Sequence, residues 1–261
     1  MNFIEVNGVR LHYRFDGPEE FPVLVLSNSL GTDLSMWNPQ IEELTKHFRV
    51  LRYDARGHGQ SDVPAGPYSI EQLGQDVVGL LDGLEIERAH FAGVSMGGMT
   101  GMWLALNVPE RLGKMAFCNT AAFIGPRTIW DARISAVQDG GMAAITEGVL
   151  ARWFTESYLE KGPDEAEQVR RVLLGTSPDG YALACAAVRD MDLRDAVKSI
   201  AVPALVISGK ADLATPPRDG QYLAEQIRGA RYVELSGAHL SNIEISGEFT
   251  RELVNFLLGH S

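Results

Sequence analysis

Gly93-Val94-Ser95-Met96-Gly97 follows a short apolar segment at residues 89–92 and precedes apolar residues at helical spacing that begin with Met99. In a G-x-S-x-G pattern the serine occupies a sharp strand-to-helix turn, and the glycines lie where a Cβ atom would collide with neighbouring backbone. The turn exposes the serine oxygen, and the next backbone N–H can bind an oxyanion. The pentapeptide also arises by chance in a chain with 27 glycines, but its flanks predict a strand and a helix. We therefore predict that Ser95 is a nucleophile.

The composition fits one large α/β domain, with or without an insertion. The chain has 261 residues, of which 45% are hydrophobic, enough to form a sizeable core. Its formal net charge of −11 argues against nucleic acid and anionic membranes as partners, because both bind basic surfaces. No apolar run approaches the length of a membrane span, and residues 1–6 do not resemble a signal peptide, so we expect a cytoplasmic protein.

The cysteine and histidine spacing predicts no metal site and no disulfide framework. Cys118 and Cys185 lie in no CxxC motif, and no two histidines have metal-ligand spacing. We expect both cysteines to be buried, reduced thiols.

Strand and helix patterns alternate along most of the chain. Two alternating segments, residues 3–6 and 9–15, surround Asn7-Gly8 and predict an N-terminal hairpin with a primed turn. Nearly continuous apolar runs predict strands buried on both faces at residues 21–27, 49–53, 89–94, 114–118, 204–208 and 231–235. Helical patterns lie at residues 37–47, 70–84, 96–107, 221–228 and 248–258. This alternation predicts a mostly parallel, doubly wound α/β sheet with helices on both faces.

The alternation stops between residues 122 and 189, where helical periodicity continues without a buried strand. Glycine- and proline-containing breaks separate four predicted helices, at residues 129–137, 142–153, 164–174 and 178–188. We therefore expect a core formed by residues 1–121 and 190–261 and a helical cap formed by residues 122–189.

Taken together, the motifs resemble those of the α/β-hydrolase superfamily over essentially the whole chain. Residues 54–61 are similar to its D-x-R-G-x-G-x-S turn, residues 93–98 to its nucleophile elbow, and residues 209–212 with Pro216-Pro217 to its acid loop. Gly237-Ala238-His239 resembles the last element of the site. The resemblance implies an α/β-hydrolase fold that needs no cofactor.

One departure points to a subfamily. Where most members have His-Gly before the oxyanion loop, this chain has residues 27–33, Ser-Asn-Ser-Leu-Gly-Thr-Asp. With residues 238–244 and 152–154, this segment resembles the 3-oxoadipate enol-lactonases of bacterial aromatic degradation.

Serine acyl transfer needs a base and a carboxylate that orients the base. On this fold the chain order is serine, acid, histidine. Ser95, Asp212 and His239 satisfy that order, and Asp212 follows the predicted strand at residues 204–208. Asp212 could instead be a loop residue bonded to its own backbone, and three aspartates where the cap ends compete with it: Asp190, Asp192 and Asp195.

The other histidines are interpreted as structural. Three lie in or beside predicted strands and helices, one lies in the glycine turn, and one lies next to the end of the sequence: His12, His47, His90, His58 and His260, respectively. His239 could also be an ordinary loop histidine.

The oxyanion hole is expected from the backbone N–H groups of Leu30 and Met96. Because backbone donors make the side chain secondary, position alone supports these two residues.

A carboxylated lactone requires a cation beside an apolar wall, because a buried carboxylate without a partner is severely destabilised. Arg133 shares a predicted helix face with Trp130 and Val137, and its guanidinium either binds the carboxylate or reaches solvent. Trp130 and Trp153 are candidate pocket walls or cap core. Other cap arginines remain candidates for the carboxylate: Arg127, Arg152, Arg170, Arg171 and Arg189.

We expect a serine hydrolase that opens a small anionic lactone, 3-oxoadipate enol-lactone, to 3-oxoadipate. The alternatives on the same fold are a carboxylesterase, a C–C bond hydrolase and a perhydrolase, and a ligand receptor without activity is a further one. The sequence leaves open the lactone isomer and the oligomeric state.

Overall fold

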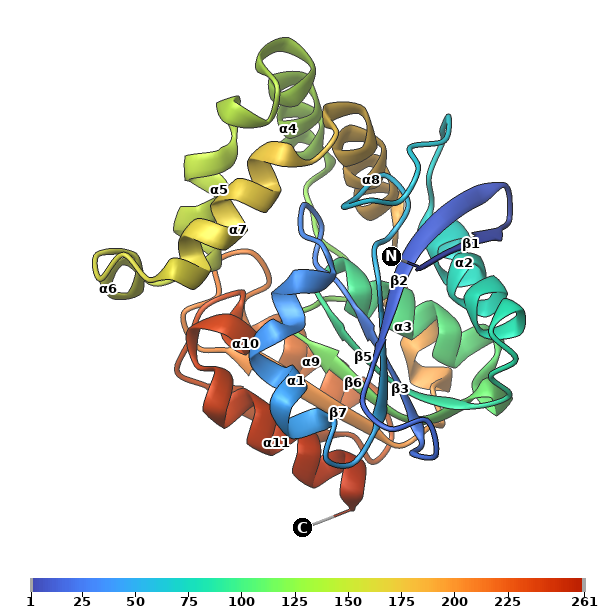
Figure 1. Ribbon diagram of the computed structural model, residues 1–261. Helices are drawn as coiled ribbons and strands as arrows, with labels where there is room; N and C mark the ends of the chain where they lie inside the picture. Colours follow the sequence, from blue (N-terminus) through green and yellow to red (C-terminus); the bar gives the residue numbers. More distant parts are fainter. Residues whose placement is uncertain (1, 260–261) are drawn as a thin grey trace.

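The computed structural model describes residues 2–259, in which eight strands form one sheet (Figure 1). The strand order is β1-β2-β4-β3-β5-β6-β7-β8. The strands are β1 (Asn2–Val6), β2 (Val9–Asp16), β3 (Val23–Ser27), β4 (Arg49–Tyr53), β5 (Ala89–Val94), β6 (Leu112–Cys118), β7 (Ala204–Gly209) and β8 (Arg231–Leu235). The pairs that involve β1 and β2 are antiparallel, and every other pair is parallel. This topology confirms the mostly parallel sheet with an N-terminal antiparallel hairpin.

The hairpin turn follows from its two central residues. Asn7 and Gly8 have φ values of 48° and 73°. A type I′ turn requires positive φ at both positions, which asparagine and glycine tolerate best. The hairpin therefore adds two strands to the edge of the parallel sheet.

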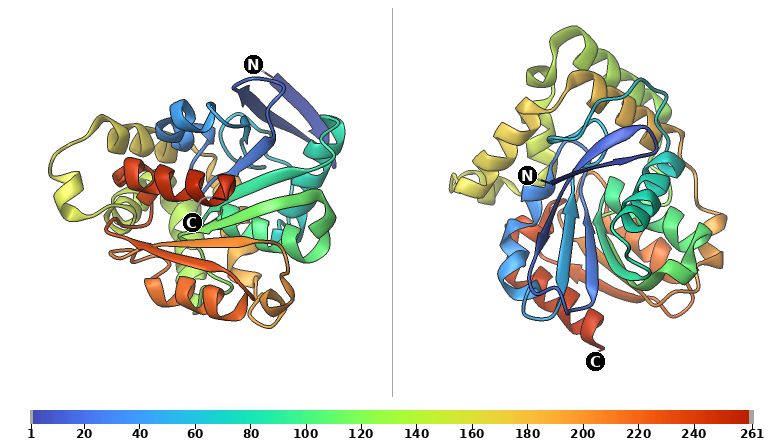
Figure 2. Two further views of the ribbon diagram at one scale, coloured as in Figure 1. Left: turned by 90° about the horizontal axis from the view of Figure 1, so that it is seen from below. Right: turned by 45° about the vertical axis from the view of Figure 1, so that its right-hand side comes forward.

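Helices cover both faces of the sheet (Figure 2). On one face α2 (Ile70–Gly83) packs on α3 (Met96–Asn107), and α9 (Pro217–Gln226) packs on β7 and β8. On the other face α1 (Asn38–Leu44) and α10 (Ser241–Glu244) pack against α11 (Ser246–Leu258). Apolar side chains from both layers and the sheet form one continuous core.

Two core helices differ from their predicted bounds. The predicted helix at residues 37–47 is a 3-10 turn, η1 (Leu34–Trp37), followed by the shorter α1, so His47 lies beyond the helix. Asp33 begins the turn by accepting the Ser35 N–H at 2.9 Å. The helix predicted at residues 221–228 begins earlier because Pro217 suits a first helical position.

Five α-helices lie between β6 and β7, and Figure 1 shows four of them, α4, α5, α7 and α8, together beyond one end of the sheet. They are α4 (Arg127–Gly140), α5 (Thr146–Trp153), α6 (Glu156–Leu159), α7 (Asp164–Gly175) and α8 (Pro178–Asp190). The single helix predicted at residues 142–153 is divided into a 3-10 turn, η3 (Met142–Ala144), and α5, and α6 was not predicted. We call residues 127–190 the helical insertion; the exact division into core and cap stays a prediction.

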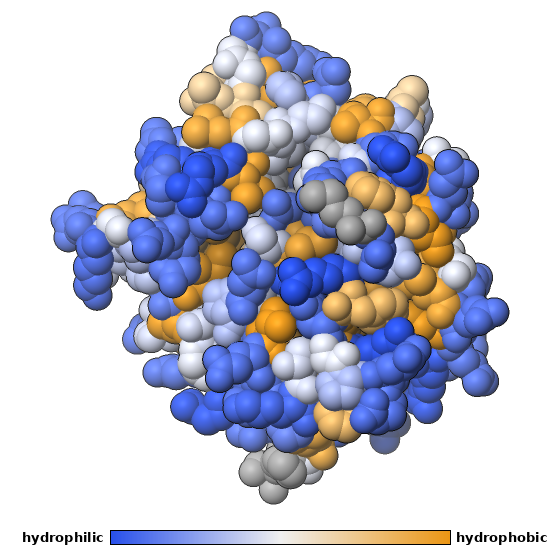
Figure 3. Space-filling view, viewed as in Figure 1, coloured by the Kyte–Doolittle hydropathy of each residue, from blue (hydrophilic) through white to orange (hydrophobic). Residues whose placement is uncertain are grey.

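The face of the protein that Figure 3 shows carries both hydrophilic and hydrophobic side chains. In the view of Figure 3, hydrophilic side chains predominate and hydrophobic ones form small clusters between them. No helix within residues 2–259 is long and apolar enough to cross a membrane. Cys118 and Cys185 are free and buried.

Candidate active site

Ser95 lies between β5 and α3 in a backbone conformation that few residues adopt. Its φ and ψ angles are 56° and −115°. The Ser95 N–H donates to the Cys118 carbonyl at 2.9 Å, and its carbonyl accepts from the Thr120 hydroxyl at 2.7 Å. These bonds to the end of β6 hold a conformation that would otherwise be unfavourable.

The flanking glycines are required by close backbone contacts. A Cβ atom on Gly93 would lie 2.2 Å from the Gly97 carbonyl oxygen, and one on Gly97 would lie 2.3 Å from that of Ser27. The turn can therefore be this tight because neither position carries a side chain.

Asp212 and His239 form a buried hydrogen-bonded pair. The Nδ1 atom of His239 lies 2.8 Å from Oδ2 of Asp212, and each residue is 2% exposed. Because an ionised carboxylate is an acceptor only, Nδ1 carries the proton and Nε2 is left as an acceptor. This tautomer is the one a general base needs.

The Asp212 carboxylate is satisfied by several neutral donors besides His239. Oδ1 accepts the backbone N–H groups of Ala214 and Thr215 at 2.8 and 2.9 Å. Oδ2 accepts the Thr215 hydroxyl at 2.9 Å and the Asn119 amide at 3.1 Å. Burial on its own would raise the pKa of Asp212, but the charge and hydrogen bond of His239 and these donors lower it below its ordinary value.

Sequence reasoning missed Asn119, which lies directly after β6. Its amide also donates to the Ala238 carbonyl at 3.1 Å, and its side-chain oxygen accepts the Ser241 hydroxyl at 2.6 Å. Asn119 therefore joins the acid loop to the histidine loop. Its position after a buried strand next to β5 was the available signal.

Ser95 and His239 line the same cavity, which has a volume of about 680 Å³. The wall combines the ends of β3 and β5, the acid loop and the helical insertion, and includes Leu30, Ile124, Trp130, Arg133, Arg152, Trp153, Tyr181 and Leu213. We call it the Ser95 cavity. No hydrogen bond joins Ser95 to His239 within residues 2–259, a separation that is common before substrate binds.

The two residues expected to supply oxyanion donors border Ser95. Met96 is the first residue of α3, so its N–H has no partner within the helix, and Leu30 lines the cavity. The loop that carries Leu30 is held by Asn28, whose amide donates to the Tyr53 carbonyl at 2.8 Å and accepts from the Trp37 indole at 3.1 Å. The distinctive Asn28 is thus a structural anchor of this loop.

Two arginines of the insertion face the Ser95 cavity. The Cζ atom of Arg133 lies 4.8 Å from the centroid of the Trp130 ring. Among the described residues, neither Arg133 nor Arg152 has a carboxylate within ion-pair distance. Burial, followed by the charge of Arg133, lowers the pKa of Arg152. Tyr181, also missed by sequence reasoning, lines the same wall, and its buried hydroxyl has no hydrogen-bond partner in the described chain.

The remaining candidates lie elsewhere. Arg127, Arg170 and Arg189 pair with acidic residues outside the cavity, and Arg171 donates to Gln168. The three competing aspartates bind neighbouring basic residues instead of a histidine. His12, His47, His58 and His90 do not line the cavity, and His260 lies outside the described residues.

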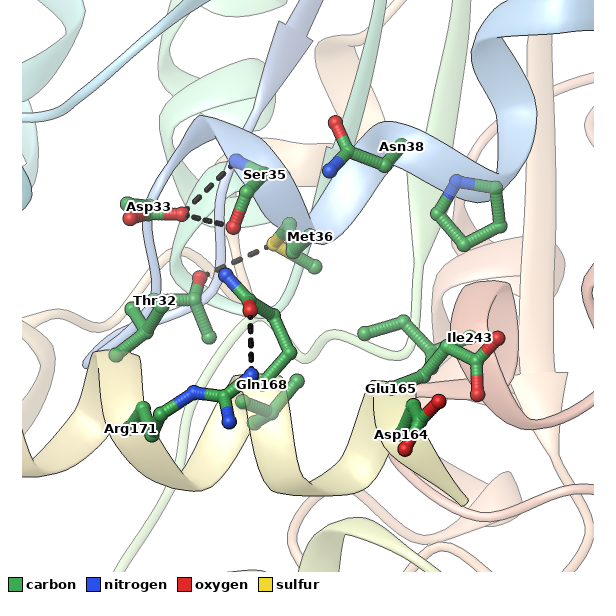
Figure 4. A pocket seen from close by; sticks show the side chains of 13 residues that line it. Thr32, Asp33, Ser35, Met36, Asn38, Asp164, Glu165, Gln168, Arg171 and Ile243 are labelled. Carbon is green, nitrogen blue, oxygen red and sulfur yellow. Dashed lines mark hydrogen bonds between the residues drawn. The ribbon is translucent and has the colours of Figure 1, made fainter.

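A second groove, of about 600 Å³, separates η1 and α1 from α7 (Figure 4). Asp33 and Ser35 bond to each other there, as do Gln168 and Arg171, while Met36, Val169 and Ile243 give it an apolar floor. It contains neither Ser95 nor a histidine. The groove is therefore not the candidate active site.

The fold and this site define a hydrolase, and the comparisons agree. The alpha/beta hydrolase fold family matches residues 22–244, and the chain belongs to that family. It is 44% identical to 3-oxoadipate enol-lactonase 2 of Acinetobacter baylyi, over 90% of this chain and 88% of that protein. It is 39% identical to 3-oxoadipate enol-lactonase 1 of the same organism, over 96% and 94% of the two chains. Within the family, the chain belongs to the group of the 3-oxoadipate enol-lactonases.

A solved structure gives the same result. The enol-lactonase from Burkholderia xenovorans LB400 superposes with a TM-score of 0.97 at 52% identity, covering 98% of this chain and 100% of that one.

Proposed function

We propose that this protein hydrolyses 3-oxoadipate enol-lactone to 3-oxoadipate, with Ser95 as nucleophile, His239 as base and Asp212 as the acid that orients it. The observation that carries the proposal is the position of the His239–Asp212 pair in the wall of the Ser95 cavity. The enol-lactonase relatives indicate which substrate to propose.

In the first half of the reaction, the Ser95 oxygen attacks the lactone carbonyl while Nε2 of His239 takes its proton. The N–H groups of Leu30 and Met96 bind the developing oxyanion. The ring C–O bond then breaks, and the enolate leaving group, on the chain that remains esterified to Ser95, takes the proton from His239, which returns the imidazole to its neutral form. Because that enol becomes a ketone, ring opening is effectively one-way.

In the second half, His239 removes a proton from water, which attacks the acyl-enzyme ester. The ester bond breaks, Ser95 recovers its proton from His239, and 3-oxoadipate leaves. A stabilised enolate is a good leaving group, so this site needs less general-acid assistance than an amidase.

The substrate carboxylate is assigned to Arg133, with Trp130 and Trp153 as apolar walls. Arg133 lacks a carboxylate partner in the described chain and lies in the wall of the Ser95 cavity. Arg152 and Tyr181 line the same wall, and Arg152 can complete this anion site.

We further propose that the partner is this small lactone and that the protein acts in the cytoplasm. A cavity of about 680 Å³ suits a small molecule. Two free cysteines are usual in a reducing compartment.

The test is incubation of the protein with freshly made enol-lactone, followed by the loss of its ultraviolet absorbance. We expect rapid loss, together with slower hydrolysis of p-nitrophenyl acetate. Turnover of the ester without the lactone would favour a carboxylesterase, and turnover of neither would favour a ligand receptor.

A further inference from the structure

Glu244 lies at the end of α10, five positions after His239, and bonds to the histidine loop (residues 237–240). Its Oε2 atom accepts the Ala238 N–H at 2.9 Å. The carboxylate therefore holds the backbone on the N-terminal side of His239.

The same carboxylate reaches the helical insertion just after α5. Its Oε1 atom accepts the Thr155 hydroxyl, and the Thr155 N–H lies 3.4 Å from both carboxylate oxygens. Glu244 thus bonds the histidine loop and the insertion at the same time.

A second link lies on the other side of His239. The Leu240 N–H donates to the Trp153 carbonyl at 3.0 Å. The Trp153 indole also stacks on the His239 imidazole, with the ring centroids 6.5 Å apart and the planes 24° from parallel. Both neighbours of His239 are therefore linked to the segment from Trp153 to Thr155, Leu240 directly and Ala238 through Glu244.

The donors around Glu244 favour a carboxylate at this position. Neutral donors approach both oxygens of Glu244, and no basic side chain lies within ion-pair distance of it in the described chain. A carboxylate accepts at both oxygens, whereas a glutamine amide accepts at one and presents donors at the other. Glutamine has nearly the same shape, but its NH2 group would face the Thr155 N–H, a donor against a donor, and could bond there only to the hydroxyl oxygen.

We propose that Glu244 is a positioning residue: with Thr155 it fixes the histidine loop to the insertion and so sets the direction of His239 Nε2 toward Ser95. The proposal rests on the assignment of His239 as the base. Because the insertion also carries Arg133, the link fixes the position of His239 relative to the site for the substrate carboxylate.

The test compares Glu244→Gln with Glu248→Gln, which removes the same charge from an exposed residue of α11 that makes no side-chain bond among the described residues. Steady-state rates are measured per active serine, titrated with a serine-reactive phosphonate, at a temperature where both variants are folded. Misplacing a catalytic group by about 1 Å can cost about a hundredfold in rate. We expect Glu244→Gln to lower kcat by about tenfold to a hundredfold with little change in KM, and Glu248→Gln to change neither.

A purely structural role would instead lower the melting temperature and leave kcat per active serine unchanged, which would overturn the proposal. Thr155→Val should reproduce the loss of kcat, whereas Thr155→Ser, which keeps the hydroxyl, should have the kcat of the wild type. The double variant Glu244→Gln with Thr155→Val should lose no more kcat than the more damaging single variant. Fully additive losses would also overturn the proposal.

Each variant is assayed on p-nitrophenyl acetate as well as on the lactone. If the wild type hydrolyses the ester alone, the assigned substrate is wrong, but the role of Glu244 is still tested on the ester.

Discussion

Nδ1 of His239 lies 2.8 Å from Oδ2 of Asp212, although 27 positions separate the two residues. The two loops that bring them together follow β7 and β8, neighbouring parallel strands whose carboxyl ends meet at one edge of the sheet. Asn119, after the next strand along, bonds to both loops.

Asp212→Asn should leave more activity than His239→Ala. Asp212 orients the imidazole, whereas His239 transfers the proton, so we expect kcat to fall by about 10³- to 10⁴-fold for Asp212→Asn and further for His239→Ala. Initial rates with the lactone measure both. A silent Asp212→Asn would return the role of the acid to Asp190, Asp192 or Asp195.

The lowered pKa of Asp212 predicts a pH dependence of stability. A carboxyl group whose pKa is lower in the folded state stabilises the fold above its unfolded value, about 3.9, and loses that contribution as the pH falls through the folded value. The difference in unfolding free energy between wild type and Asp212→Asn should therefore shrink as the pH falls below about 4. Urea unfolding at several pH values measures it, and a difference that is constant or grows toward acid contradicts the assignment.

Local motifs could be predicted from the sequence because they depend on neighbouring residues. The elbow at Gly93–Gly97 and the turn at Asn7-Gly8 are examples, and the apolar runs predicted six parallel strands. Contacts between distant segments left no local motif of this kind. Asn119 meets Asp212 across 93 positions, and Tyr181 reaches the cavity because α8 packs on α4.

One helix of the insertion shows why helix bounds were hard to predict. The periodicity of residues 142–153 continues through Ile145, where the backbone changes from the 3-10 turn η3 to α5. Hydrophobic spacing records which side chains are buried, and both helix types bury them at similar spacing.

Arg133→Met should separate substrate binding from structure. Methionine keeps the apolar bulk beside Trp130 and removes the charge. The fall in kcat/KM for the carboxylated lactone should therefore correspond to about 2 to 5 kcal/mol of lost transition-state stabilisation. The rate on neutral p-nitrophenyl acetate should hardly change. Equal losses on both substrates would mean that Arg133 supports the insertion, and the anion-binding role would pass to Arg152.

Gly97→Ala should destabilise the fold by about 1 to 3 kcal/mol, because the new Cβ atom would lie 2.3 Å from the Ser27 carbonyl oxygen. Gly247→Ala is the control, since Gly247 is exposed in α11 and has no atom within 4 Å of an added Cβ. Helix propensity predicts that this change is neutral or stabilising by up to about 1 kcal/mol. Denaturant unfolding compares the two, and equal stability would contradict the tight turn.

The serine mechanism is tested by the rate of enol-lactone loss catalysed by Ser95→Ala, followed in the ultraviolet beside the wild type. The Ser95 side chain lies at the Ser95 cavity, so the variant should keep the circular dichroism spectrum and melting temperature of the wild type. We predict a loss of at least about 10³-fold in kcat, because alanine removes the nucleophile. A folded Ser95→Ala protein with activity within tenfold of the wild type would contradict the serine mechanism.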